Sequence, residues 1–317
     1  MKRTLRKTWV CNDVWMDIFP LFDRPQLGLK LALTSPRFDA LVDKHFDGKS
    51  ELTVRKAICI QEDSDTEVPK LSVFVNFANS VDFPLPERTL STPVLTFLRS
   101  NKHIWDGGIQ MDLRMCAVRP IWGVFAREIW PIFATNIRDL VIEYGDLDKL
   151  RRYISPTIFT DLNTITTIHS GGLTPEVIAD DGPNATVGQA LSKWLHTPTT
   201  DGQPKRLYCS NHNGLRMKEW ESKLSKAFAC ATATSSASFE VHFNVYAPTT
   251  QIVPFELVNE RTKEKLTLEQ KSTARGNCWL LKRCPIIVGG TASVQRQRKD
   301  ENLDSVLFYL SAASCIW

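Results

Sequence analysis

Residues 10–46 read VCNDVWMDIFPLFDRPQLGLKLALTSPRFDALVDKHF, and this stretch decides how the chain begins to fold. Five apolar residues in its first part recur at helical spacing: Val10, Val14, Ile18, Leu21 and Phe22. That spacing places them on one face of a helix. Either Asn12 or Asp13 is expected to cap the start of this helix, because a short acceptor side chain can bind the unpaired backbone N–H groups.

Two further helices are predicted within the same stretch. Asp23 is placed to cap a helix through Leu27–Leu33, and Ser35 with Pro36 repeats the start signal for a third helix. Proline is tolerated at the first helical position, where the backbone N–H has no partner within the helix. Gly48 is expected to end the third helix, because glycine readily adopts the left-handed conformation of a helix end.

Three short helices within residues 8–47 bury too little surface to be securely stable alone. Their apolar faces exceed what helices of this length can hide from one another, and each large apolar side chain that is buried contributes about 1.5–3 kcal/mol. The remaining apolar surface is therefore expected to contact either the rest of the chain or another protein. The alternative is that residues 10–46 are simply the first helices of one larger globular domain.

The segments Val10–Phe19, Asp23–Leu27 and Leu33–Phe38 resemble the F-box motif. Together with residues 182–207 and 254–268, they are similar to the expanded F-box-like families of plant-parasitic nematodes. In that family the motif is a three-helix element that binds a Skp-type linker protein. The linker in turn joins the cullin scaffold of an SCF-type ubiquitin ligase.

The resemblance implies a function and a set of contact residues. The chain would be the substrate-recognition adaptor of a ubiquitin ligase, a non-catalytic subunit without a cofactor or metal. The residues implied for linker binding are Val10, Val14, Ile18, Phe19, Leu27 and Phe38. Val10–Cys11 stands where the family has Leu-Pro, which bears on how tightly the linker binds. The alternative is a protein-interaction scaffold that has lost linker binding.

The chain after Glu51 predicts alternating strands and helices. Strands are expected at 52–60, 71–77, 109–115, 137–143, 164–169, 206–209 and 239–246, with helices at 121–133, 146–162, 185–195 and 215–229. Pro156 is expected to kink or split the helix at 146–162. A hairpin is expected at 255–269, with further short strands or a last helix at 279–281 and 306–310.

These patterns predict an α+β or α/β protein with two parts. A three-helix F-box-like module at 8–47 is followed by a strand–helix partner-binding domain at 48–317. Strand–helix units that recur every 20–45 residues or so are typical of solenoids. We therefore expect an irregular, leucine-rich-repeat-like horseshoe, by analogy with other F-box proteins. The competing interpretation is one α/β domain around a central sheet.

Composition excludes several classes of protein. The 317 residues carry a net charge of +4, but basic and acidic residues alternate, unlike the one-signed stripe of a nucleic-acid-binding protein. No apolar run is long enough to span a bilayer, so no membrane contact is expected. The basic N-terminus lacks the apolar segment of a signal peptide. The eight cysteines form no CxxC pair, and we expect a reduced chain in the cytoplasm or nucleus.

No catalytic motif is present, and the six histidines are isolated in the sequence. His169–Gly172 superficially suggests an oxyanion loop, although a loop after a strand uses the same residues. Asp180–Asp181 could bind a cation, but a solvated acidic loop is favoured. Trp105 and Trp279 are candidate anchors for a partner, with burial in the core as the alternative. An unrecognised hydrolase would require distant His, Ser and Asp side chains to meet in one pocket.

Overall fold

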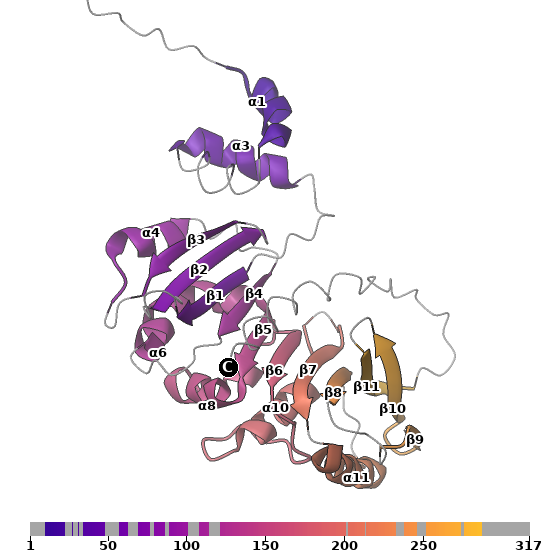
Figure 1. The fold of residues 1–317 in the computed structure, drawn as a ribbon. Helices are drawn as coiled ribbons and strands as arrows, with labels where there is room; N and C mark the ends of the chain where they lie inside the picture. Colours follow the sequence, from indigo (N-terminus) through magenta and orange to yellow (C-terminus); the bar gives the residue numbers. More distant parts are fainter. Residues whose placement is uncertain are drawn as a thin grey trace, which may run out of the picture.

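The fold is that of a computed structural model (Figure 1). It describes residues 10–22, 27, 31, 34–47, 57–62, 69–76, 79–85, 89–100, 108–113, 121–200, 202–212, 214–232, 238–245, 252–273 and 276–286. Within these ranges the protein is a mixed α/β protein with one large sheet and several helices.

The N-terminal helices begin and end much as the sequence predicts. Helix α1 spans Asn12–Ile18 and continues into a 3-10 turn, η1, at Phe19–Leu21. Helix α3 spans Pro36–Asp47, and the Ser35 hydroxyl accepts a hydrogen bond from the backbone N–H of Phe38 at 3.3 Å, which confirms the predicted cap. The expected caps of α1 are wrong: Cys11 occupies the N-cap position, and no side chain caps this helix.

The predicted second helix lies mostly outside the described residues. Only Leu27 and Leu31 of that segment are described, and both pack in a small hydrophobic cluster with α1 and α3. Gly48, the predicted terminator of the third helix, also falls outside the described ranges. The three-helix arrangement of the module therefore stays a prediction.

The described strands form one continuous sheet of eleven strands, in the order β3-β2-β1-β4-β5-β6-β7-β8-β11-β10-β9. The strands are β1 (Ala57–Glu62), β2 (Pro69–Asn76), β3 (Asn79–Pro84), β4 (Ile109–Leu113), β5 (Ile137–Glu143), β6 (Thr167–Gly171), β7 (Lys205–His212), β8 (Phe239–Val245), β9 (Phe255–Asn259), β10 (Glu264–Thr273) and β11 (Gly276–Pro285). From β1 through β4 to β8 all neighbours are parallel and follow chain order. Antiparallel strands extend both ends.

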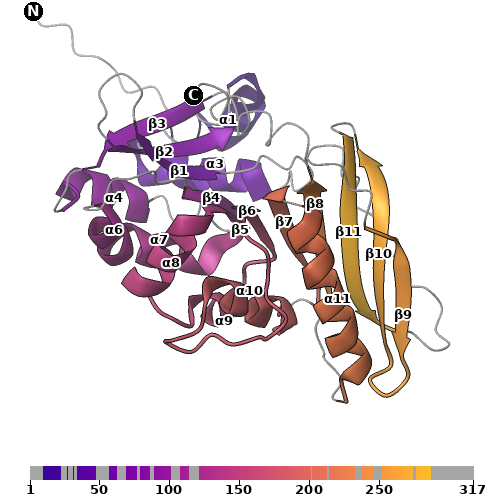
Figure 2. The same cartoon turned by 60° about the horizontal axis from the view of Figure 1, so that its bottom comes forward.

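Helices connect the parallel strands. They are α4 (Thr92–Ser100), α6 (Ile121–Val124), α7 (Trp130–Phe133), α8 (Tyr144–Tyr153), α9 (Ile158–Asp161), α10 (Val187–His196) and α11 (Gly214–Cys230). Figure 2 shows α8, α10 and α11 together on one side of the strands. This follows from the topology, because right-handed connections that always step in the same direction place their helices on the same face.

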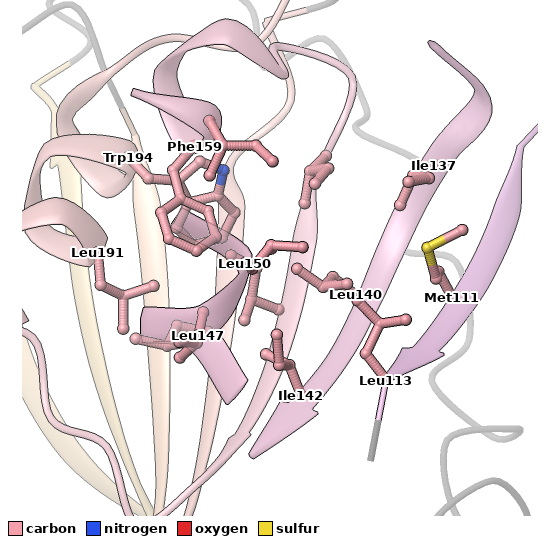
Figure 3. Packing of buried hydrophobic residues seen from close by; sticks show 14 of the residues in the cluster. Met111, Leu113, Ile137, Leu140, Ile142, Leu147, Leu150, Phe159, Leu191 and Trp194 are labelled. Atoms are coloured by element: carbon pink, nitrogen blue, oxygen red, sulfur yellow. The ribbon is translucent and has the colours of Figure 1, made fainter. Parts of the chain in front are cut away.

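Strand residues alternate between the helix side and the opposite side of the sheet. Ile168, Leu207 and Val241 are fully buried on the helix side, in register with one another. Figure 3 shows this core between α8, α10 and strands β4 and β5. The labelled side chains are Met111, Leu113, Ile137, Leu140, Ile142, Leu147, Leu150, Phe159, Leu191 and Trp194, all in the main hydrophobic cluster.

Prolines explain two breaks in the helices. The segment predicted as one helix at Ile121–Phe133 contains a π-helical turn, η4, at Phe125–Ile129 between α6 and α7. Pro131 lacks an N–H group and its ring crowds the carbonyl four residues earlier, so the hydrogen-bond ladder shifts there. Pro156 separates α8 from α9, as the sequence predicts.

Two elements were not predicted, and one prediction is untested. The sequence pattern did not reveal β3 or α4, although Phe83 and Phe97 from these elements pack with 5.3 Å between their ring centroids. The segment 306–310 lies beyond the described part of the chain. None of the helices in the described ranges combines the length and apolar character needed to cross a membrane.

Candidate partner-binding sites

The N-terminal helices form a hydrophobic cluster that shares no residue with the core of the sheet. Phe19, Leu27, Leu41 and Val42 are buried in it, and Trp15, Met16, Leu31 and Phe38 pack around them. The aromatic rings meet edge to face, with 4.8 Å between the centroids of Trp15 and Phe38 and 5.5 Å between those of Phe19 and His45. Such pairs contribute about 0.5–1.5 kcal/mol beyond the area they bury.

A polar contact fixes the start of α1 against α3. The Arg37 guanidinium donates to Asn12 Oδ1 from Nε at 3.1 Å and from a terminal nitrogen at 2.7 Å. The same terminal nitrogen also donates to the backbone carbonyl of Val10. Arg37 therefore ties two segments that are 25 residues apart. This role could not be predicted from the sequence, because nothing in the local pattern distinguishes Arg37 from a solvated arginine.

The six residues implied for linker binding do not share one environment. Phe19 and Leu27 are 0% and 1% exposed, and Phe38 is partly buried against the same cluster. Val10 and Ile18 are partly buried without belonging to that cluster, whereas Val14 is 44% exposed. Val14 and Ile18 can thus contact a partner directly. Phe19 and Leu27 would act through the fold of the helices.

Exposed apolar side chains remain on α1 and just after it. Leu21 is 83% exposed and Phe22 is 42% exposed, together with Val14. Val14 lies on α1, whereas Leu21 ends the 3-10 turn η1 and Phe22 follows it in an extended conformation. We refer to Val14, Leu21 and Phe22 as the N-terminal apolar set. The helix pattern included Leu21 and Phe22, but the resemblance did not assign them to linker binding.

On the side of the sheet opposite the helices, three aromatic rings stack across neighbouring strands. His169 on β6 pairs in register with Tyr208 on β7, and Tyr208 pairs with His242 on β8. Ring centroids are 4.6 Å apart in the first pair and 4.4 Å apart in the second, and both pairs are stacked. Neighbouring strands lie at a constant distance, so planar side chains at paired positions stack on one another.

A charged row runs beside this stack. Glu240 on β8 lies between Arg206 on β7 and Lys282 on β11, with N···O distances of 3.4 Å and 3.3 Å. The register places all three residues side by side on adjacent strands. This side of the sheet therefore carries stacked rings and charges beside the buried aliphatic side chains of Val141 and Leu280, which pair in register with His169 and His242.

The hydrolase alternative finds no support in these positions. His169 and Ser170 are adjacent residues of one strand, so their side chains point to opposite faces of the sheet. Asp180 Oδ1 accepts from the backbone N–H of Gly182 at 3.0 Å, and Asp181 accepts from the Thr160 hydroxyl. These contacts give both aspartates a role in shaping the loop. Among the described residues, no group of three or more His, Cys, Asp or Glu side chains could hold a metal ion.

Two of the described thiols and one candidate tryptophan anchor are buried. Burial raises the pKa of the Cys209 thiol and that of the Cys278 thiol, which disfavours the reactive thiolate. Trp279 is 4% exposed within the main core, which confirms burial in the core, the alternative to its role as a partner anchor. Trp105, the other candidate anchor, lies outside the described ranges.

No known protein family, curated protein or solved structure matches this chain. The F-box resemblance therefore rests on the residues quoted above and on no wider similarity.

Proposed function

We propose that this chain is the substrate-recognition adaptor of an SCF-type ubiquitin ligase. The N-terminal helices bind a Skp-type linker and through it a cullin, and the sheet domain holds a target protein. The adaptor makes and breaks no bonds. It contributes proximity, because a target held beside the recruited enzyme reacts as if the step were unimolecular.

The exposure of apolar residues on α1 and directly after it carries this proposal. The N-terminal cluster closes around Phe19, Leu27, Leu41 and Val42 without using the N-terminal apolar set. Large exposed apolar side chains that lie close in the sequence are candidates for an interaction site. A helix that is apolar on its inner side, exposes Val14 and is followed by the exposed Leu21 and Phe22 is suited to dock on another polypeptide.

The sheet domain fits the target-binding half of the proposal. Its parallel strands follow chain order and its connecting helices α8, α10 and α11 lie on one side, which is the arrangement expected of a leucine-rich-repeat-like horseshoe. The stacked rings of His169, Tyr208 and His242 lie on the opposite side. Strand pairing would hold the half-buried rings of Tyr208 and His242 in fixed positions for recognition, beside the buried His169.

The test is linker binding by the full chain. The double variant Val14→Asp with Leu21→Asp places two charges among exposed residues that the N-terminal cluster does not need. The expected result is at least a tenfold loss of affinity for a recombinant Skp-type linker, measured by calorimetry. Ile18→Asp should act in the same direction. Val253→Asp is the matched control, because Val253 is 68% exposed in the sheet domain.

Undiminished linker binding by the double variant would refute docking through α1. The scaffold alternative makes a different forecast, motivated by Val10–Cys11 in place of Leu-Pro. In that case the wild-type chain shows no linker binding at all. Affinity capture of its partners would then return proteins other than the linker and cullin, and these would still bind the double variant if the sheet domain alone holds them.

A further inference from the structure

The end of helix α10 meets the antiparallel strands through a short chain of buried polar groups. His196 is the last residue of α10, Arg283 lies on β11 and Glu264 begins β10. Arg283 and Glu264 are 8% and 0% exposed. The groups come from distant parts of the sequence, since 87 residues separate His196 from Arg283.

The contacts of His196 define its protonation state. Its Nδ1 lies 2.7 Å from the backbone carbonyl oxygen of Ser192, which can only accept, so Nδ1 carries a proton. Its Nε2 lies 3.0 Å from a terminal nitrogen of Arg283, which can only donate, so Nε2 must hold a free lone pair. The two contacts together require the neutral imidazole.

Arg283 extends the connection to the next strand. Its second terminal nitrogen donates to Glu264 Oε2 at 2.8 Å, and its guanidinium lies over the Phe228 ring of α11 at 5.4 Å. The arginine therefore contacts α10, α11 and β10 at once from its place on β11. The remaining Glu264 oxygen and Arg283 Nε have no hydrogen-bond partner among the described residues. A buried network that is only partly satisfied is sensitive to the loss of any one contact.

We propose that the His196–Arg283–Glu264 chain is an acid-sensitive latch that holds the β9–β10–β11 strands against the end of α10. A proton taken from solvent adds to the Nε2 lone pair of His196 and removes the acceptor for Arg283. The imidazolium and guanidinium then face each other as like charges about 3 Å apart in a buried site, where screening is weak.

The surrounding charges do not prevent this opening. The charged groups around His196 are Arg283 from β11, Glu264 from β10 and Lys193 from its own helix. Lys205 of β7 also lies at this helix end, where its amine donates to the Trp194 carbonyl. Phe239 of β8 closes the site with an apolar ring 5.3 Å from the imidazole. Glu264 is the one anion in this set, and Arg283 already neutralises it.

The direction of the pH effect follows from the same burial. Desolvation lowers the pKa of His196 below its ordinary value of 6.5, against the raising effects of the Ser192 carbonyl and Glu264. The folded protein therefore resists a proton that the unfolded chain accepts. The latch is closed above pH 6.5 and is lost as the pH falls through the lowered pKa of the folded state.

The experiment is hydrogen exchange of the full chain at about pH 7.5 and about pH 5, with rates corrected to protection factors. In the wild type, protection within 264–285 should fall by about 10- to 100-fold at the lower pH, the range for one hydrogen bond to a charged group. Protection in β4, β5 and β6 should change far less. The overall fold is checked by circular dichroism at both pH values.

Two variants make the result specific to the imidazole. His196→Gln offers an amide oxygen in place of Nε2 and cannot titrate, so its protection within 264–285 should be the same at both pH values. Asn259→Ala removes a second contact between the antiparallel strands and a helix end, since Asn259 Nδ2 of β9 donates to the carbonyls of Phe228 and Ala231 at the end of α11. That variant should be looser at both pH values and keep the wild-type pH response.

The latch is overturned if the wild type loses no more protection in 264–285 than in β4–β6. It is equally overturned if His196→Gln loses protection on acidification as the wild type does. Neither result depends on linker binding, so the latch and the proposed adaptor function fail or survive separately.

Discussion

Replacing the buried Lys205 by methionine should change how the stability of this protein depends on pH. Lys205 is 1% exposed, its amine donates to the Trp194 carbonyl at 2.6 Å, and it lies 5.0 Å from the centre of the Trp194 ring. Burial lowers its pKa from 10.5 to about 7. Methionine has a similar shape and no charge to desolvate, so Lys205→Met removes the titration and keeps most of the packing.

The size of the effect comes from the two pKa values. Between about pH 7 and 10.5 the unfolded chain holds a proton on Lys205 that the folded chain has released, so the free energy of unfolding rises with pH. Each pH unit contributes about 1.4 kcal/mol when a full proton differs between the two states. The lysine is half protonated near pH 7 in the folded state. The wild type should therefore gain about 2 kcal/mol relative to Lys205→Met between pH 7 and about pH 9.

Urea unfolding at both pH values, followed by circular dichroism, measures this difference directly. Methionine avoids the cost of burying a charged amine. The free energy of unfolding of the variant relative to that of the wild type should therefore be higher at pH 7 than at pH 9. The matched control is Lys223→Met, because Lys223 is exposed on α11 and pairs only with Glu219 in the described structure. If Lys205→Met and the wild type have parallel pH profiles, Lys205 is protonated throughout and the reasoning from its burial is refuted.

Arg151→Met should lower the free energy of unfolding by about 3 kcal/mol in urea denaturation, because the buried guanidinium donates to the carbonyls of Pro156, Gly182 and Ala185. Its neighbour Arg152 is exposed, so Arg152→Met should change stability by less than about 0.5 kcal/mol, and equal losses would contradict this account. Phe19→Ala should cost the N-terminal helices about 3–5 kcal/mol and raise hydrogen exchange in α1 and α3. Unchanged exchange there, or an equal rise in β4–β6, would show that the two hydrophobic clusters are not independent.

Local signals predicted some elements closely. Strand β5 at Ile137–Glu143 matches its predicted range, since its apolar residues include the β-branched Ile137, Val141 and Ile142, which favour a strand. The start of α3 at Pro36 was likewise predicted from the pair Ser35–Pro36. Pro156 marked the break between α8 and α9. In each case the deciding interaction joins residues only a few positions apart.

Contacts between distant residues could not be predicted in this way. Nothing near His196 in the sequence points to Arg283, and the stack of His169, Tyr208 and His242 depends on the register of three strands. Strand β3 was missed because its proline and polar residues suit an edge strand as well as a loop. Hydrophobic periodicity identifies single helices and strands. The His196–Arg283 contact and the ring stack arise only when the order and register of the strands are set.

The inner face of α1 shows why the site was harder to predict than the helix. Val14 and Trp15 are adjacent, and the helix is apolar on both of the faces they occupy, so spacing alone cannot decide which one turns inward. The structure buries the Trp15 and Phe19 side, which offers rings for edge-to-face packing with Phe38 and His45. The Val14 side is left outward, and each large apolar side chain there forgoes about 1.5–3 kcal/mol of burial. A small module that leaves this free energy unused within the described chain can recover it on binding, which is why the residues that the core does not need are the ones that test the adaptor proposal.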